Sequence, residues 1–306
     1  MRRYLLLTAI WGASFLLIKL GLEALVPLQV VLARMGFGAL VMAVVMVTRR
    51  EALPRGTRVW GQLFVAANLL NTVPFTLFAY AEQRIPSAMA AICNATTPLF
   101  TLVVVMLALP EERPTPRRFA GLALGFVGVF VVLGAWNAAA GPDAIGVGLA
   151  LAAAVCYAIG GVYLRRTLSK TPYSGLALTT AQLWIGAIEL AIVTPAVTDA
   201  PAHLPARVVI AMAVLGALGT GLAYALQHAL IRSAGATFAS TVTYWIPVVS
   251  IALGVVVLGE RLAWNAPVGA AIIIAGALVS RARTRVVTPV CAVAPLELAS
   301  WPRGPS

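Results

Sequence analysis

Residues 28–47 read LQVVLARMGFGALVMAVVMV, and this stretch decides the class of fold. Its 20 residues include one charge, Arg34. A helix of about 20 residues crosses the roughly 30 Å of hydrocarbon in a bilayer. The run is too continuous for a strand of a membrane barrel, which has about 10 residues of alternating polarity. Because lipid offers no partners for backbone N–H and C=O groups, the stretch predicts a membrane-spanning α-helix.

Nine further apolar runs of this kind follow or precede it along the 306 residues. The ten predicted spans cover residues 4–22, 28–47, 59–80, 88–109, 119–135, 146–164, 173–193, 208–230, 237–258 and 262–280. The chain is 61% hydrophobic and 10% charged, against about 25% charged residues in an average soluble domain. This composition predicts an all-α integral membrane protein with ten transmembrane helices, and it excludes a soluble fold and a disordered chain.

The basic residues predict the orientation of the spans. With the N-terminus inside, 17 of the 22 Lys and Arg residues fall on inner segments, four on outer ends and one within a span. Since cytoplasmic loops are enriched in Lys and Arg, we expect a multi-pass protein of the cell (plasma) membrane with both termini cytoplasmic. The same asymmetry explains the net charge of +12 without a nucleic-acid partner. The first run is interpreted as an uncleaved span.

An internal repeat is the second organising pattern. A shift of 148 residues places Arg34 on Gln182, Gly38 on Gly186, Thr72 on Thr220, Arg84 on Arg232, Glu112-Arg113 on Glu260-Arg261, Gly121 on Gly269 and Gly128 on Gly276. Five spans are then repeated after five spans, and an odd number reverses the direction of the second copy. The pattern predicts two inverted five-helix repeats, residues 1–137 and 144–282, followed by a disordered cytoplasmic tail, residues 283–306.

Short segments within this frame carry a family resemblance. They are Ala9-Ile10-Trp11-Gly12-Ala13-Ser14-Phe15, Leu32-Ala33-Arg34, Pro98-Leu99-Phe100 and Gly259-Glu260-Arg261. In the first repeat the last of these motifs lacks its glycine and reads Pro110-Glu111-Glu112-Arg113. The chain resembles the EamA-type members of the drug/metabolite transporter superfamily over roughly residues 4–282. The resemblance implies a ten-helix bundle that exports amino acids, other metabolites or drugs, and export as the direction rests on the resemblance alone.

Polar residues recur at helical spacing within several predicted spans, as Asn68, Asn71 and Thr72 do at i, i+3 and i+4. One interpretation is hydrogen bonding between helices, which Ser, Thr and Asn make routinely in membranes. The other is a cavity at the interface of the two repeats. The cavity interpretation predicts a substrate-binding set of Trp11, Ser14, Asn68, Asn71, Thr72, Asn94, Thr97, Tyr157, Thr220, Tyr224, Gln227, Thr241 and Tyr244.

Two charges, Arg34 and Glu189, are predicted to be buried at similar depth in the membrane. Because a lone charge in lipid is costly, we expect them to pair or to face each other across a cavity. Two alternatives stay open: each snorkels separately to the outer interface, or Glu189 serves as a proton-coupling site. Lys19 and Glu23, four residues apart at the outer end of the first span, are interpreted as a surface pair.

The doubled Glu-Arg motif lies in loops on opposite faces of the membrane. We expect Glu112-Arg113 and Glu260-Arg261 to cap the next helix or to tie it to the neighbouring span, and a gating salt bridge is the alternative.

No enzyme motif is found in the sequence: HExxH, GxSxG and GxxxxGK[ST] are absent, and no metal or cofactor site is expected. The expected partners are a small-molecule substrate and the lipid bilayer. The predicted function is secondary-active export of amino acids or related small metabolites by alternating access. The alternative is a nucleotide-sugar or sugar-phosphate exchanger, although a phosphate needs more cations than Arg34. A membrane-embedded enzyme or channel is the remote alternative.

Overall fold

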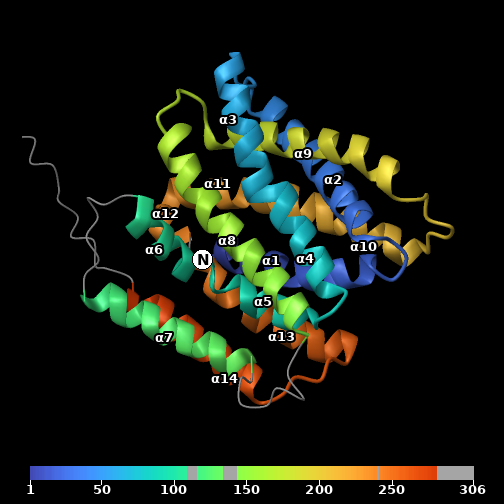
Figure 1. Ribbon diagram of the computed structural model, residues 1–306. Helices are drawn as coiled ribbons and strands as arrows, with labels where there is room; N and C mark the ends of the chain where they lie inside the picture. Colours follow the sequence, from blue (N-terminus) through green and yellow to red (C-terminus); the bar gives the residue numbers. More distant parts are fainter. Residues whose placement is uncertain (109–115, 134–142, 240, 281–306) are drawn as a thin grey trace, which may run out of the picture.

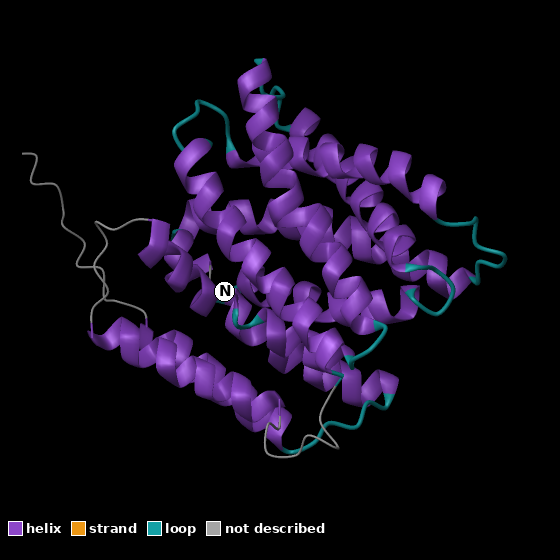
Figure 2. Ribbon diagram, viewed as in Figure 1, coloured by secondary structure: helices purple, strands orange, loops and turns teal. Residues whose placement is uncertain are grey.

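The computed structural model describes residues 1–108, 116–133, 143–239 and 241–280, and every regular element within these ranges is a helix (Figures 1 and 2). Seven helical segments are long and apolar enough to cross a membrane: Arg2–Gly21 (α1), Pro27–Thr48 (α2), Thr57–Glu82, Ser87–Ala108, Ala144–Thr167 (α8), Gly175–Val197 (α9) and Ala206–Ala234. Shorter apolar helices are α7 (Pro116–Leu133), α13 (Val242–Leu258) and α14 (Asn265–Ser280). The predicted all-helical, multi-pass membrane class is confirmed. The predicted tail, residues 283–306, lies outside the described residues.

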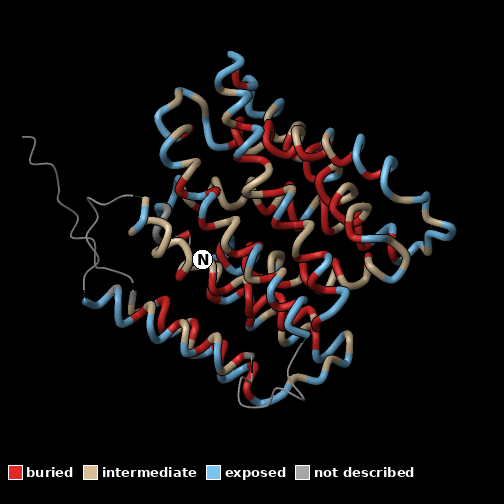
Figure 3. The backbone as a smooth tube through the Cα atoms, viewed as in Figure 1, coloured by how far each residue is buried: buried red, intermediate tan, exposed pale blue. Residues whose placement is uncertain are grey.

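Large apolar side chains cover the outside of the bundle, as a lipid environment requires. Val256, Leu107 and Ile192 are 81%, 79% and 68% exposed. Buried residues concentrate where helices face one another (Figure 3).

Two of the long segments contain a π-helical turn. Residues 57–82 are α3 (Thr57–Ala67), η1 (Asn68–Thr72) and α4 (Val73–Glu82), and residues 206–234 are α10 (Ala206–Gly216), η2 (Ala217–Leu222) and α11 (Ala223–Ala234). Pro74 follows η1 and has no N–H to give to the carbonyl four residues earlier. The shift of 148 residues carries 68–72 onto 216–220. This range overlaps η2, so the two π-helical turns lie at overlapping positions of the two copies. Such turns are frequent at functional sites.

A third segment is broken rather than bulged. It consists of α5 (Ser87–Asn94) and α6 (Thr97–Ala108). Pro98 cannot donate to the Asn94 carbonyl, and the Thr97 hydroxyl donates to that oxygen instead, at 2.7 Å. A similar short helix, α12 (Ala236–Ala239), precedes α13.

Two helix pairs bring the early and late parts of the chain together. Figure 1 shows α7 and α14 side by side along one edge of the bundle. Their backbones touch at glycines: a Cβ on Gly276 would lie 2.7 Å from Gly121 O, and a Cβ on Gly128 would lie 2.9 Å from Gly269 O. Close approach through small residues is typical of helix packing in membranes. Under the 148-residue shift, each of these contacts maps onto the other.

The second pair is α2 with α9, and each of these helices also packs on a π-helical turn. A Cβ on Gly38 of α2 would lie 2.8 Å from Thr220 Cγ2 in η2. A Cβ on Gly186 of α9 would lie 2.5 Å from Thr72 Oγ1 in η1. The same 148-residue shift exchanges these two contacts, so the glycines set the distance at which both pairs pack.

Candidate functional site

A cavity of about 390 Å³ lies at the centre of the bundle. Eight residues of the predicted set line it: Trp11, Ser14, Asn71, Asn94, Thr97, Tyr157, Tyr224 and Gln227. Its wall is mainly aromatic and aliphatic, with a few polar groups, and its size is that of a small-molecule site. Three ring contacts organise the wall: the centroids lie 6.4 Å apart for Trp11 and Tyr224, 6.2 Å for Phe78 and Tyr157, and 5.6 Å for Phe15 and Phe78.

Asn71 is the centre of a hydrogen-bonded network in this wall. It is 1% exposed. Its Nδ2 donates to Gln182 Oε1 at 3.3 Å, and its Oδ1 accepts from Tyr224 Oη at 2.9 Å. The three residues come from η1, α9 and α11, so the network fixes the spacing of three segments around the cavity.

Five residues of the predicted set do not line the cavity. Asn68, Thr72, Thr220, Thr241 and Tyr244 lie outside its wall. The Thr241 hydroxyl bonds to Tyr4 Oη at 2.8 Å, and Tyr244 is buried in the apolar core. The i, i+3, i+4 argument fails at Asn68, Asn71 and Thr72 because the π-helical turn holds more residues per turn than an α-helix. Asn71 lines the cavity, whereas Asn68 and Thr72 bond to Glu189 outside the wall.

Sequence reasoning missed most of the apolar wall. The missed lining residues are Phe15, Ile18, Leu70, Phe75, Phe78, Leu164, Thr179, Gln182, Gly219, His228, Ile231, Thr243 and Ile246. Most are aliphatic or aromatic residues, and the local sequence does not distinguish such residues in a cavity wall from those that face lipid. Gln182 could have been identified from the sequence, because the internal repeat aligns it with Arg34.

Arg34 lines the cavity and is 8% exposed. Its Nε donates to Thr220 Oγ1 at 2.9 Å, and its Cζ lies 3.6 Å from the centroid of the Phe75 ring. The ring face supplies a cation–π contact. Thr220 does not line the cavity itself, but it holds the Arg34 guanidinium, which does.

The predicted pairing of Arg34 with Glu189 is wrong. Glu189 accepts hydrogen bonds from Asn68 Nδ2 at 2.8 Å and Thr72 Oγ1 at 3.3 Å. The carboxylate is therefore satisfied by neutral donors on η1, and it is absent from the cavity wall. The prediction compared only the depth of the two residues in the membrane. Depth does not say on which side of its helix a residue lies, so equal depth did not place the two side chains next to each other.

The predicted pair of Lys19 and Glu23 is also wrong. Lys19 Nζ donates to the carbonyls of Glu82 and Ile85, the latter at 3.2 Å, and Glu23 pairs with Arg207 at 2.8 Å. Lys19 thus binds the last carbonyl of α4, where a cation is favoured by the helix dipole, and the Ile85 carbonyl in the turn that follows.

Glu82 is a buried carboxyl group that the sequence analysis did not identify. It is 0% exposed, and neither of its carboxylate oxygens has a hydrogen-bond partner among the described residues. The predicted span ends at residue 80, so it does not include Glu82. The helix continues through Glu82 and turns it inward.

Glu260 caps a helix, but not the one that follows it. Its Oε1 accepts from Ser87 N at 2.7 Å and its Oε2 from Ala88 N at 3.2 Å, at the start of α5. A carboxylate there satisfies free N–H groups and complements the helix dipole. Arg261 is exposed, and Glu112 and Arg113 lie outside the described residues.

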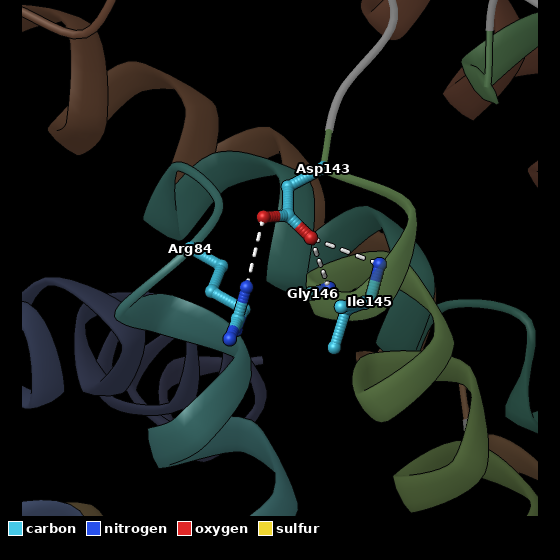
Figure 4. A network of polar contacts seen from close by, with 4 residues as sticks. All are labelled: Arg84, Asp143, Ile145 and Gly146. Carbon is cyan, nitrogen blue, oxygen red and sulfur yellow. Dashed lines mark hydrogen bonds and ion pairs between the residues drawn. The ribbon is translucent and has the colours of Figure 1, made fainter.

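A second carboxylate caps α8 near the same loops (Figure 4). Asp143 Oδ1 accepts from Ile145 N and Gly146 N at 2.9 and 3.0 Å, and Oδ2 pairs with Arg84 Nη1 at 3.2 Å. The Gly146 N–H above all, with Arg84 and the Ile145 N–H, holds the pKa of Asp143 below its ordinary 3.8.

Apolar helices arranged around an aromatic and polar cavity are the architecture of a membrane transporter. The particular family follows from comparison with known sequences. The model of the EamA-like transporter family matches residues 4–134 and again 144–282, and the chain belongs to this family. The resemblance seen in the short motifs is thereby confirmed, and the chain is a transporter of the drug/metabolite type.

Several relatives are similar over most of their length. An "Uncharacterized inner membrane transporter YedA" of Escherichia coli (strain K12) is 26% identical, over 83% of this chain and 81% of the relative. A "Probable amino-acid metabolite efflux pump" of Salmonella typhimurium is 24% identical, over 89% and 91%. A "Probable terminal-alkyne amino-acid exporter" of Streptantibioticus cattleyicolor is 24% identical, over 92% and 93%. A crystal structure with 21% identity has the same fold, with a TM-score of 0.67 over 91% of this chain and 94% of the other.

Proposed function

We propose that this transporter exports amino acids or related small metabolites across the cell membrane by secondary-active alternating access. The observation that carries the proposal is the central cavity, whose wall takes residues from both segments matched by the family model. Its eight lining residues from the predicted set are the proposed substrate contacts. Two relatives are named for amino-acid efflux, which supports the same class of substrate.

The proposal includes two inverted five-helix repeats, residues 1–137 and 144–282. The exchanged glycine contacts support it: the α7–α14 and α2–α9 pairs each map onto themselves under one sequence shift, as a two-fold axis between the repeats requires. The overlap of η1 and η2 under the same shift supports it as well. In the proposed cycle the two halves rock about the cavity, and no nucleotide is used.

The proposed orientation places both termini in the cytoplasm. It is tested by single cysteines at residue 51, between α2 and α3, and residue 199, between α9 and α10, in a background without the three native cysteines. An impermeant thiol reagent applied to intact cells should label residue 199 and spare residue 51. Labelling of both positions, or the reverse pattern, contradicts the orientation.

A nucleotide-sugar or sugar-phosphate exchanger is the weaker proposal. Phosphate groups are bound by several cations or bidentate arginines. Arg34 is the one Lys or Arg among the described residues that line the cavity. The wall therefore favours a smaller and less charged solute.

Transport in proteoliposomes tests the proposed function. Purified protein is assayed with labelled amino acids, with and without a pH gradient, so that the same panel reports proton coupling. Tyr224→Ala should abolish most of the flux because Tyr224 lines the cavity and holds Asn71. Tyr80→Ala is the matched control, since Tyr80 is 40% exposed and outside the wall. Folded wild-type protein that moves no amino acid under either condition refutes the proposal.

A further inference from the structure

The cavity carries its formal charge at one point. Among the described residues of its wall there is no Asp, Glu or Lys, and Arg34 is the one Arg. Two carboxyl groups of the spanning helices lie outside the wall: Glu189 bonds to η1, and Glu82 forms no ion pair with Arg34 among the described residues. His228, the titratable ring in the wall, bonds to the Thr179 hydroxyl at 3.0 Å. The described wall thus holds a buried cation and no acidic side chain.

The guanidinium of Arg34 is held in place and incompletely used. Thr220 takes its Nε, and Phe75 covers one face. Among the described residues, its two terminal nitrogens have no hydrogen-bond partner and no ion-pair partner. Because Thr220 fixes one nitrogen and Phe75 one face of the guanidinium, its two terminal nitrogens are pre-oriented for a ligand. Such pre-orientation reduces the entropy lost on binding.

A planar guanidinium fork matches a carboxylate, which it binds through two parallel N–H···O bonds. A buried cation also favours a ligand of opposite charge, because an unpaired charge in such a setting is costly. From this geometry, and resting on the proposed function, we propose that Arg34 is the carboxylate anchor of the transported solute. The anchor makes the carboxylate a required part of the substrate.

The rest of the wall describes the rest of the solute. Trp11, Phe15, Phe78 and Tyr157 form an apolar, aromatic surface for a hydrophobic body. Among the described residues of the wall no carboxylate can receive an ammonium, so an ammonium would meet neutral acceptors, such as the amide oxygens of Asn94 and Gln227 and the Thr243 hydroxyl, and the ring faces. The substrate class is therefore an apolar monocarboxylate, in which an α-ammonium group is tolerated and dispensable.

Four probes separate these contributions: L-phenylalanine, 3-phenylpropanoate, phenylalanine methyl ester and 2-phenylethylamine. Binding to the purified full-length protein in nanodiscs is measured by calorimetry. The two carboxylates should bind within about tenfold of each other, and the ester and the amine should bind about tenfold to a hundredfold more weakly, as expected for loss of charge-assisted hydrogen bonds. An ester or amine that binds as tightly as the acids overturns the anchor.

Substitution of Arg34 completes the cycle between protein and ligand. Arg34→Gln should weaken the two carboxylates about tenfold to a hundredfold and leave the ester unchanged, whereas equal losses for acid and ester show a merely structural role. Thr220→Val keeps the charge and removes the orienting acceptor, so it should weaken the acids selectively even where Arg34→Gln is poorly folded. An unchanged acid affinity in a folded Thr220→Val protein contradicts the pre-oriented fork.

The same variants distinguish this proposal from the function on which it rests. Undiminished amino-acid transport by Arg34→Gln overturns the anchor and leaves the exporter proposal standing. A wild-type protein that neither binds nor transports any carboxylate of the panel overturns both.

Discussion

An alanine at position 276 tests whether α7 and α14 pack backbone to backbone. The new Cβ would lie 2.5 Å from Gly125 N, 2.7 Å from Gly121 O and 2.7 Å from Gly125 Cα. All three are main-chain atoms, so no change of rotamer can make room. Since ordinary contact begins at 3.4 Å, the helices must separate by 3.4 − 2.5 = 0.9 Å at this point.

Overpacking of this kind costs about 1–3 kcal/mol, and the better helix propensity of alanine returns about 0.5–1 kcal/mol. We expect Gly276→Ala to lose about 1–2 kcal/mol, which lowers Tm by roughly 2–6 °C in a protein of this size. Gly128→Ala should lose a similar amount, because its Cβ would lie 2.7 Å from Ile273 N and 2.9 Å from Gly269 O. Equal losses at these two positions are what the two-fold relation predicts.

Thermal unfolding of detergent-purified protein, followed by the loss of the monodisperse peak on size exclusion, measures the change. Gly36→Ala and Gly148→Ala are matched controls: both are helical glycines, and an added Cβ would meet nothing within 4 Å. The controls should leave Tm unchanged or slightly raised. A Gly276→Ala protein as stable as Gly36→Ala refutes the close packing of α7 on α14.

Three further predictions concern charged groups. Glu260→Ala should lower the free energy of unfolding by about 1–2 kcal/mol because α5 loses its cap. Arg261→Ala, at the exposed neighbouring position, is the control and should change it little. Equal effects of the two substitutions contradict the cap. Folding lowers the pKa of Asp143, so the stabilisation by its carboxylate is present above the ordinary pKa of 3.8 and is lost as the pH falls through the lower folded pKa. The thermal stability of Asp143→Asn should lack this dependence on acid pH. An unchanged dependence in Asp143→Asn would mean that another group causes it. Arg34→Ala and Glu189→Ala should lower Tm additively because the two residues share no partner. If the double variant loses much less Tm than the sum of the two single losses, the two residues are paired after all.

The membrane class could be predicted from sequence because the apolar character of a span is local. The run at residues 28–47 became α2, at Pro27–Thr48, with almost the same bounds. The ends were less certain, since helix propensity continues where hydrophobicity stops. Glu82 shows the consequence: two residues beyond the apolar run, it still belongs to α4 and is fully buried.

The cavity could be predicted in part. Eight of its residues followed from polar or aromatic side chains in apolar spans, because such groups need a partner or a cavity. The charge partners could not be predicted, since Arg34 and Thr220 are 186 residues apart and meet only through helix packing. The π-helical turn was also hidden, so the face of the helix carrying Asn71 was assigned on an α-helical period that η1 does not follow.

The positions that the 148-residue shift pairs fall into two groups, and the difference bears on function. Positions that hold helices together are alike in both copies: Gly38 with Gly186, Thr72 with Thr220, and the glycines of α7 with those of α14. Positions that give the cavity its chemistry differ: Arg34 is paired with Gln182, and Asn71 with Gly219. A scaffold that must present the same packing in two orientations is constrained to stay symmetric, whereas a solute with one charged end needs an asymmetric wall. In the proposed two-fold scaffold, the single arginine where the other copy has a glutamine is therefore the position that we propose sets the orientation of the ligand.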